Sequence, residues 1–215
     1  MKYKAVLFDM DGTVLDTLED LHDSMNHCLA EFSLPPVSRE QVRQGLGNGA
    51  VYLVSRCVPE DYLPERQQQF LDIYKPWYAA HCCIKTSPYP GILSVMHELQ
   101  KKGVRLSIIS NKPDPAVQEL AEAFFPGLLE LVVGESPDVR RKPAPDTVLI
   151  AAERMDLSVH DCVYVGDSEV DIQTARNAGM DCISVTWGFR NEDQLIAAGA
   201  NIIIHEPKEL LRFIL

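Results

Sequence analysis

The sequence predicts an α/β protein whose core is a doubly wound parallel sheet and whose second, smaller domain is an inserted all-helical cap. Two observations lead to this prediction. From about residue 88 onward, short apolar runs alternate with helical patterns, whereas residues 16–87 contain helical patterns and no strand-like run. Another strand-like run precedes the helical stretch. We therefore expect a core domain at residues 1–15 and 88–215, with the cap domain at 16–87.

Six short apolar runs, rich in β-branched residues, predict buried parallel strands. These runs cover residues 5–8, 104–110, 131–134, 162–166, 182–186 and 201–204. Helices are predicted between them at 92–102, 116–124, 145–155, 170–178 and 192–198. Such alternation is typical of a Rossmann-like sheet, in which ligands bind at the carboxyl ends of the strands.

The insert at 16–87 shows apolar residues at helical spacing, beginning with Leu21, Met25 and Cys28. Further helices are predicted at residues 39–46, 50–57 and 64–81. We expect the aromatic side chains of the last of these helices to pack inside the cap. They are Tyr74, Trp77 and Tyr78.

Composition limits the classes of function. The chain has 215 residues and a formal charge of −11, which disfavours nucleic acid and anionic membranes as partners. Its apolar runs are too short to span a bilayer, and its N-terminus is expected to form a strand and not a secretory leader. The six cysteines are expected to be free thiols. We therefore expect a soluble, cytoplasmic protein, and a monomer because no oligomerisation seam is evident.

The clearest chemical motif runs from Asp9 to Val14, where the first predicted strand ends. Asp9 and Asp11 are two residues apart and project to the same side of an extended chain. One carboxylate can attack phosphorus while the other exchanges a proton with the leaving oxygen and then with water. Taken alone, the motif is equally compatible with a solvated Asp-Gly turn.

Two further segments offer phosphate-binding groups. Ser110 and Asn111 stand at the end of the strand predicted at 104–110 and offer a hydroxyl and backbone N–H groups, although such residues often only cap a helix. Residues 140–142 are Arg-Arg-Lys, and we expect one of these cations to contact the phosphate of the substrate. A solvated basic loop is the alternative.

The fourth motif follows the strand predicted at 162–166. Asp167 and Asp171 are four residues apart and would share a face of a helix that begins there. A carboxylate cluster at this edge of the sheet suits a hard cation with oxygen ligands, and Mg²⁺ fits best. Helix capping by Asp167 and Ser168 is the alternative.

Together, these motifs resemble those of the haloacid-dehalogenase-like (HAD) superfamily in type and order. The segments are Asp-Met-Asp-Gly-Thr at 9–13, Ser-Asn at 110–111, Lys-Pro at 142–143 and Gly-Asp-Ser-x-x-Asp at 166–171. The resemblance implies that Asp9 forms an aspartyl phosphate and that Asp11 is the general acid and base. It further implies that Thr13, Ser110, Asn111 and Lys142 bind the phosphoryl group, and that Mg²⁺ is held by Asp9, Asp11, Asp167 and Asp171, the last directly or through water.

Within this superfamily the chain resembles bacterial phosphoglycolate phosphatases. The resemblance rests on segments 45–50, 89–91, 140–146 and 186–188. Gly47, Asn48 and Gly49 could bring backbone N–H groups to an anionic substrate tail, or the glycines could merely end a helix. The expected partner is a small phosphorylated metabolite. A β-phosphoglucomutase-like phosphotransferase, a pyrophosphatase, a broad sugar or nucleotide phosphatase and a non-catalytic phosphate-binding module remain alternatives.

Overall fold

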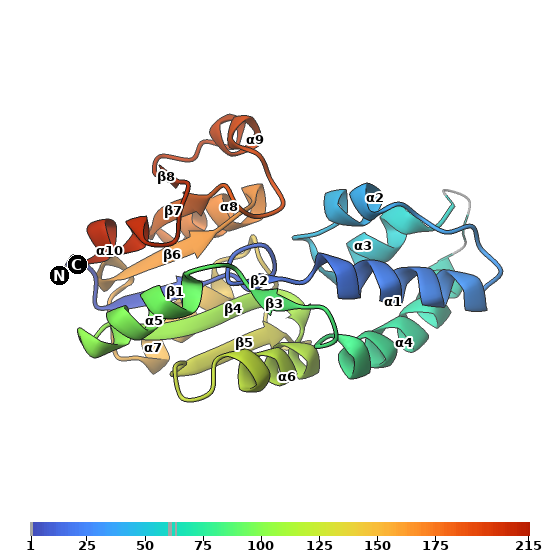
Figure 1. The fold of residues 1–215 in the computed structure, drawn as a ribbon, viewed down its shortest axis with the longest axis horizontal. Helices are drawn as coiled ribbons and strands as arrows, with labels where there is room; N and C mark the ends of the chain where they lie inside the picture. Colours follow the sequence, from blue (N-terminus) through green and yellow to red (C-terminus); the bar gives the residue numbers. More distant parts are fainter. Residues whose placement is uncertain (1, 60–61, 63) are drawn as a thin grey trace.

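The computed structural model describes residues 2–59, 62 and 64–215. A six-stranded sheet forms the core, with strand order β5-β4-β1-β6-β7-β8 and every neighbouring pair parallel (Figure 1). The strands are β1 (Ala5–Phe8), β4 (Arg105–Pro113), β5 (Leu131–Glu135), β6 (Cys162–Gly166), β7 (Asp181–Val185) and β8 (Ile203–Ile204). The predicted fold class is confirmed.

The strand order fixes where the site must lie. The chain builds outward from β1 to β4 and β5, then crosses back over β1 to add β6, β7 and β8. Connections therefore leave β1 and its two neighbours toward opposite sides, which opens a crevice at their carboxyl ends. All four predicted motifs belong to segments that meet at this edge.

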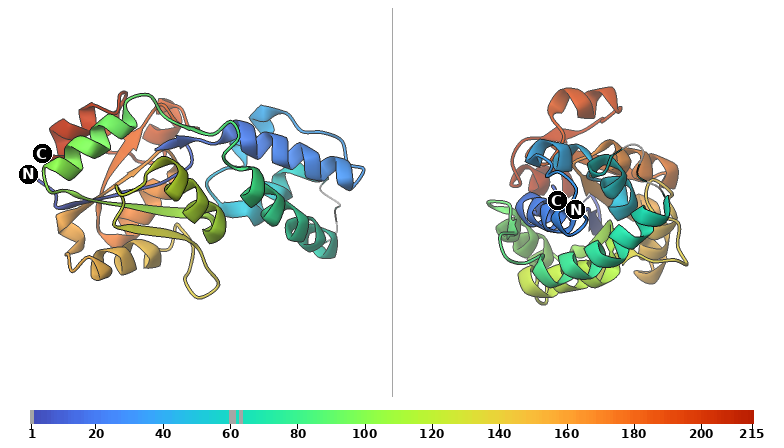
Figure 2. Two further views of the ribbon diagram at one scale, coloured as in Figure 1. Left: turned by 60° about the horizontal axis from the view of Figure 1, so that its bottom comes forward. Right: turned by 90° about the vertical axis from the view of Figure 1, so that its right-hand side faces the viewer.

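Helices cover both faces of the sheet, as the two views of Figure 2 show. The core helices are α5 (Ile92–Lys101), α6 (Asp114–Phe124), α7 (Asp146–Arg154), α8 (Glu169–Ala178), α9 (Glu192–Ala197) and α10 (Glu209–Ile214), with a 3₁₀ turn, η1, at Val159–Asp161. Because successive strand residues point to opposite faces, Val6 and Phe8 pack with α5 and α10, whereas Ala5 and Leu7 pack with α7 and α8.

One strand boundary and one helix differ from the predictions. Strand β4 continues past residue 110 to Pro113, because its pairing with β5 resumes at Pro113 and Glu135 after a register shift that begins at Ile109. Ser110 and Asn111 therefore lie within an irregular strand and not after it. Helix α10 was not predicted.

The insert forms four helices beyond the carboxyl ends of the strands, and we refer to them as the cap (Figure 1). They are α1 (Leu18–Glu31), α2 (Arg39–Gln44), α3 (Gly49–Cys57) and α4 (Pro64–His81). The two segments that connect the core to the cap pair as short antiparallel strands, β2 (Leu15–Asp16) with β3 (Ser87–Pro88). The carboxylate of Asp20 strengthens this junction by accepting backbone hydrogen bonds from residues 84–86 at 2.8–3.0 Å.

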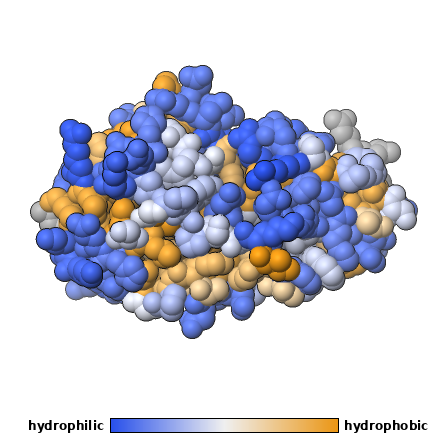
Figure 3. Space-filling model, viewed as in Figure 1, coloured by the Kyte–Doolittle hydropathy of each residue, from blue (hydrophilic) through white to orange (hydrophobic). Residues whose placement is uncertain are grey.

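Hydrophilic residues cover most of the face seen in Figure 3. In the part of the chain that the structure describes, no helix combines the length and the apolar character needed to cross a membrane.

The central strand provides a direct test of the packing. Leu7 on β1 is fully buried in the layer against α7 and α8, whereas Leu149 on α7 is 41% exposed. Replacing Leu7 with Ala is expected to lower the free energy of unfolding by about 2–5 kcal/mol, through lost burial and a residual cavity. The matched Leu149→Ala change is expected to alter it by less than about 0.5 kcal/mol. Equilibrium denaturation in urea measures both, and equal effects would contradict this packing.

Candidate active site

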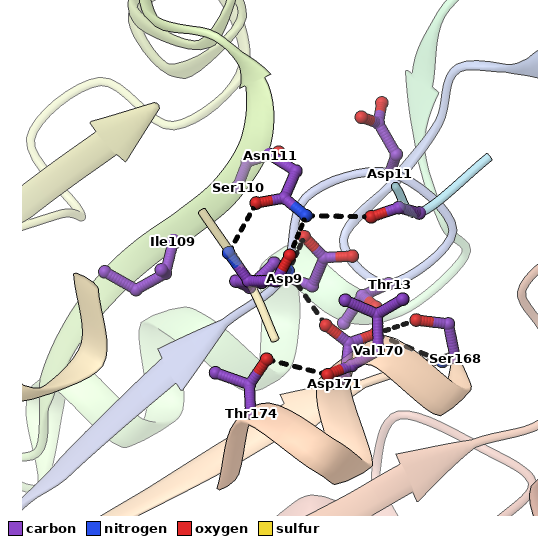
Figure 4. Close-up of polar contacts among 12 residues, drawn as sticks. Asp9, Asp11, Thr13, Ile109, Ser110, Asn111, Ser168, Val170, Asp171 and Thr174 are labelled. Atoms are coloured by element: carbon purple, nitrogen blue, oxygen red, sulfur yellow. Dashed lines mark hydrogen bonds and ion pairs between the residues drawn. The ribbon is translucent and has the colours of Figure 1, made fainter. Parts of the chain in front are cut away.

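The four predicted segments meet at the carboxyl ends of β1, β4 and β6 (Figure 4). Asp9 follows β1, and its backbone N–H donates to Val165 of β6 at 2.8 Å, which holds it at the strand end. Lys142 comes from the loop before α7, and its Nζ lies 2.8 Å from Asp9 Oδ1. Both residues are buried. Of the basic triplet, therefore, it is Lys142 that enters the site.

The partners of Lys142 are buried as well. Its Nζ also lies 2.8 Å from Asp171 Oδ1 and donates to the hydroxyl of Tyr164 at 2.8 Å. Burial alone would lower the pKa of Lys142, but Asp171 and Asp9 hold it well above its ordinary value. Lys142 is thus a permanent cation. The sequence analysis did not identify Tyr164. Its alternation with Cys162 places it on the face of β6 that packs against α7, and the loop that carries Lys142 leads into α7.

Asn111 holds the loop of Lys142 in place. Its side-chain amide donates to the carbonyls of Lys142 at 2.9 Å and Gly47 at 3.0 Å, and its oxygen accepts from the backbone N–H of Lys142 at 2.8 Å. The side chain predicted to bind phosphate is therefore occupied with joining the core loop to the cap. Ser110 lines the site cavity, and its hydroxyl accepts the N–H of Lys112 at 3.2 Å.

Three carboxylates form a compact acidic cluster. Asp9, Asp167 and Asp171 each place one oxygen within 4.8 Å of the others, and all three are buried. Burial, followed by repulsion from Asp171 and Asp9, raises the pKa of Asp167 well above its ordinary value. Burial and Asp171 raise the pKa of Asp9 to about 7, although Lys142 opposes this shift. Buried carboxylates that repel one another are the donor set a divalent cation would stabilise.

Within this cluster, Asp171 differs from the other two. Its Oδ1 contacts Lys142, and its Oδ2 accepts from the N–H and hydroxyl of Ser168 at 3.1 and 2.6 Å. The carboxylate of Asp171 therefore has three polar partners among the described residues, whereas that of Asp9 has Lys142 and that of Asp167 accepts two hydrogen bonds. Asp171 is suited to anchoring Lys142, and Asp9 and Asp167 remain the better direct ligands for a cation.

Asp167 is held by close backbone packing. Its Oδ2 accepts the N–H of Phe189 at 2.6 Å, and its Oδ1 accepts the hydroxyl of Thr13 at 3.4 Å, so Thr13 orients a carboxylate here. A Cβ on either Gly12 or Gly188 would overlap the carboxylate of Asp167. Gly12 also has φ +80°, which favours glycine. The sequence analysis did not show that Gly188 leaves room for the carboxylate of Asp167.

Asp11 lies beside the cluster and faces the cap. Thr17 donates its hydroxyl to Asp11 Oδ1 at 2.5 Å, and Lys112 Nζ lies 2.8 Å from the same oxygen. Asp11, Ser110 and Lys112 line one cavity together with Asp9. The predicted pair of carboxylates is thus present, with one held by Lys142 and the other by Lys112.

The cap closes this cavity with its glycine-rich loop. Gly47 and Gly49 line the cavity, as predicted for a substrate-facing loop, whereas Asn48 is not among the lining residues. The same loop also ends α2, because Gly45 is its C-cap. Arg190 holds the loop against the core by donating to the carbonyl of Leu46 at 3.0 Å while pairing with Glu169 at 2.8 Å.

The aromatic residues of α4 divide into two groups. Trp77 stacks between His27 and His81, with ring centroids 3.5 and 4.0 Å apart, and so packs within the cap as expected. Tyr74 and Tyr78 instead line the cavity. Their spacing of four residues on α4 places them on one helix face.

Comparison with known proteins identifies the family. Residues 6–185 match the model of the haloacid dehalogenase-like hydrolases. The chain therefore belongs to this family.

Its relatives lie among the phosphatases of that family. An N-acetylmuramic acid 6-phosphate phosphatase of Pseudomonas aeruginosa is 32% identical over 98% of this chain and 94% of its own length. A phosphoglycolate phosphatase of Mannheimia succiniciproducens is 30% identical over 99% of both chains. The crystal structure of a candidate phosphoglycolate phosphatase from Lactobacillus delbrueckii is 40% identical, with a TM-score of 0.94 over 100% of this chain and 99% of that one. The predicted superfamily and enzyme class, a phosphatase, are confirmed.

The acidic cluster predicts how the stability of the metal-free protein depends on pH. The pKa of Asp9 is about 7 in the folded protein, against an ordinary value of 3.8, so the folded state binds its proton more tightly than the unfolded state. The stabilisation from this proton is present at acidic pH and is lost as pH rises toward 7. Between pH 5 and 7, we expect the free energy of unfolding to fall by up to about 1.4 kcal/mol per pH unit.

Urea denaturation in the presence of EDTA at several pH values measures this slope. Replacing Asp9 with Asn removes one of the two carboxyl groups with a raised pKa and is expected to reduce the slope. Stability of the unsubstituted protein that rises with pH across this window would contradict the assignment.

Proposed function

We propose that the protein is a Mg²⁺-dependent phosphomonoester hydrolase that acts through an aspartyl phosphate on Asp9, with 2-phosphoglycolate as its substrate. The observation that carries the proposal is the buried arrangement of Asp9, Lys142 and the acidic cluster, with Asp11 beside it in the same cavity. Phosphoryl transfer depends mainly on positioning and charge neutralisation, and this arrangement supplies both.

Asp9 is the nucleophile in this mechanism. A carboxylate oxygen of Asp9 attacks phosphorus and forms the new O–P bond, while the ester oxygen leaves with its bonding electrons and receives a proton from Asp11. Asp11 then takes a proton from water as that water attacks phosphorus, which releases phosphate and restores Asp9. Thr17, 2.5 Å from Asp11 Oδ1, keeps the acid oriented toward the cavity.

Lys142 and the acidic cluster supply the electrostatics. The ammonium of Lys142, 2.8 Å from Asp9, offsets the repulsion between an anionic nucleophile and an anionic phosphate. Asp9, Asp167 and the backbone carbonyl of Asp11 would hold Mg²⁺, with Asp171 positioned to orient its waters. When bound, the ion would neutralise charge on the phosphoryl oxygens.

The size of the cavity and the relatives favour a small substrate. The cavity has a volume of about 50 Å³ in this arrangement of cap and core. A glycolate leaving group has a comparable size, whereas an amino sugar requires much more room or a displaced cap. The phosphoglycolate phosphatases of Mannheimia succiniciproducens and of Xanthomonas campestris, both 30% identical, agree with this choice. N-acetylmuramic acid 6-phosphate is the second candidate because of the 32% identical relative.

The remaining expectations extend the proposal. We propose that residues 16–87 are a cap domain that moves against a core of 1–15 and 88–215, since the two crossings at β2 and β3 are short. Six free cysteines, four of them buried, favour a reducing compartment, and we propose the cytoplasm. A monomer suffices for this chemistry, because all the residues assigned to it come from one chain.

Phosphate release tests the chemistry. Purified protein with Mg²⁺ is expected to hydrolyse 2-phosphoglycolate with a kcat/KM at least about tenfold above those for N-acetylmuramic acid 6-phosphate, pyrophosphate and β-glucose 1-phosphate. Asp9→Asn is expected to lower kcat by about 10⁴-fold or more, because the nucleophile is lost. The exposed Asp193 on α9 provides a matched Asp→Asn control with unchanged activity.

The outcomes separate the alternatives. Interconversion of glucose phosphates without phosphate release would indicate a mutase, and an equal rate on all esters would indicate a broad phosphatase. Full activity of Asp9→Asn would exclude the aspartyl phosphate.

Metal binding can be tested without turnover. Saturating Mg²⁺ is expected to raise the melting temperature by about 5–10 °C, because the ion binds the folded acidic cluster and relieves its repulsion. Asp167→Asn is expected to abolish this shift while leaving the metal-free protein at least as stable, since one buried charge is removed. Asp193→Asn should preserve the shift. A Mg²⁺ shift that survives in Asp167→Asn would place the ion elsewhere.

A further inference from the structure

Lys112 is a second buried cation in the cavity, and phosphoryl transfer does not account for it. It is 5% exposed, and its Nζ lies 2.8 Å from Asp11 Oδ1. The same ammonium donates to the hydroxyl of Tyr78 on α4 at 2.6 Å and lies 4.3 Å from the centre of that ring. Lys142 already serves the nucleophile. Lys112 instead lies beside the acid, where the leaving group departs.

Tyr74 provides an independent observation in the same cavity. Its side chain lines the cavity and is only 2% exposed, yet its hydroxyl has no hydrogen-bond partner among the described residues. A buried hydroxyl without a partner is unfavourable, because it has lost its hydrogen bonds to water. Such a cost is explained when a bound group supplies the missing partner.

We propose that Lys112 and Tyr74 bind a carboxylate carried by the leaving group of the substrate. This inference rests on the proposed function and names the residues that would select an acidic leaving group. In 2-phosphoglycolate, one methylene separates the ester oxygen from the carboxylate. Because Asp11 protonates that oxygen and also contacts Lys112, the ammonium lies within reach of a carboxylate at this distance.

The charges around the cavity support an anionic ligand at this point. Asp9 and Asp171 both pair with Lys142, whereas Lys112 has Asp11 as its carboxylate partner. A carboxylate from the substrate would give Lys112 a second anion, much as Lys142 has two. The apolar side chains of Leu21 and Leu53, which line the same cavity, keep water from competing for this pair.

A ratio of two substrates tests the proposal. 2-Hydroxyethyl phosphate matches 2-phosphoglycolate in length but carries a neutral hydroxymethyl group in place of the carboxylate. The unsubstituted protein is expected to favour 2-phosphoglycolate in kcat/KM by about 10²-fold. Lys112→Met is expected to reduce this ratio by at least about tenfold, and Tyr74→Phe by about 3- to 10-fold. The exposed Lys102, which follows α5 at the opposite edge of the sheet, gives a matched Lys102→Met control with an unchanged ratio.

Using the ratio separates recognition from catalysis. Lys112 contacts Asp11, so its loss is expected to slow both substrates, and only the ratio reports the carboxylate. If Lys112→Met slows both equally, Lys112 serves Asp11 alone and the proposal is wrong. If the unsubstituted protein fails to hydrolyse 2-phosphoglycolate, the proposed function itself is wrong. If circular dichroism shows that Lys112→Met does not fold, the Tyr74→Phe variant tests the proposal in its place. An unchanged substrate ratio in Tyr74→Phe would then show that the proposed carboxylate-binding site is wrong.

Discussion

The ion pairs of the buried Lys142 are the interaction on which the rest of the site depends. Its ammonium is shared by Asp9 and Asp171 at 2.8 Å each, in a part of the protein from which water is excluded. An unpaired charge at this depth would cost several kcal/mol. The surrounding structure therefore holds this loop tightly: Asn111 makes two hydrogen bonds to the backbone of Lys142 and a third to the cap at Gly47.

One cation does not balance this cluster. Lys142 pairs with Asp9 and Asp171, so the three carboxylates outnumber their cation, and burial together with their repulsion raises the pKa of Asp9 and Asp167. The folded protein is thereby suited either to take up protons or to bind a divalent cation. The glycines at 12 and 188 permit this arrangement, because any side chain there would displace Asp167.

The sequence predicted the features that depend on local patterns, and it did not predict the contacts between distant segments. Strand and helix patterns, the order of the motifs and the convergence of Asp9, Lys142 and Asp167 depend on periodicity and on strand ends, and the fold was predicted well. The partners of Asn111 could not be predicted, because they join three segments distant in the chain. The contact between Lys112 and Asp11 could not be predicted either. It depends on the irregular continuation of β4, which brings the ammonium of Lys112 to Asp11 and the cap.

The distribution of charge between core and cap explains how one chemistry can serve several substrates. The groups assigned to the phosphoryl group belong to the core and are linked by buried ion pairs, so replacing any of them disturbs the others. The cap faces the leaving group through uncharged groups, the Gly47 loop and the hydroxyls of Tyr74 and Tyr78. Exchanging Tyr74, whose hydroxyl has no partner among the described residues, would leave the ion pairs of the phosphoryl site in place. Relatives near 30% identity that bear the names of different phosphate esters are consistent with this division. We therefore expect relatives with different substrates to differ first in the residues where Lys112 contacts the cap, and less in the acidic cluster.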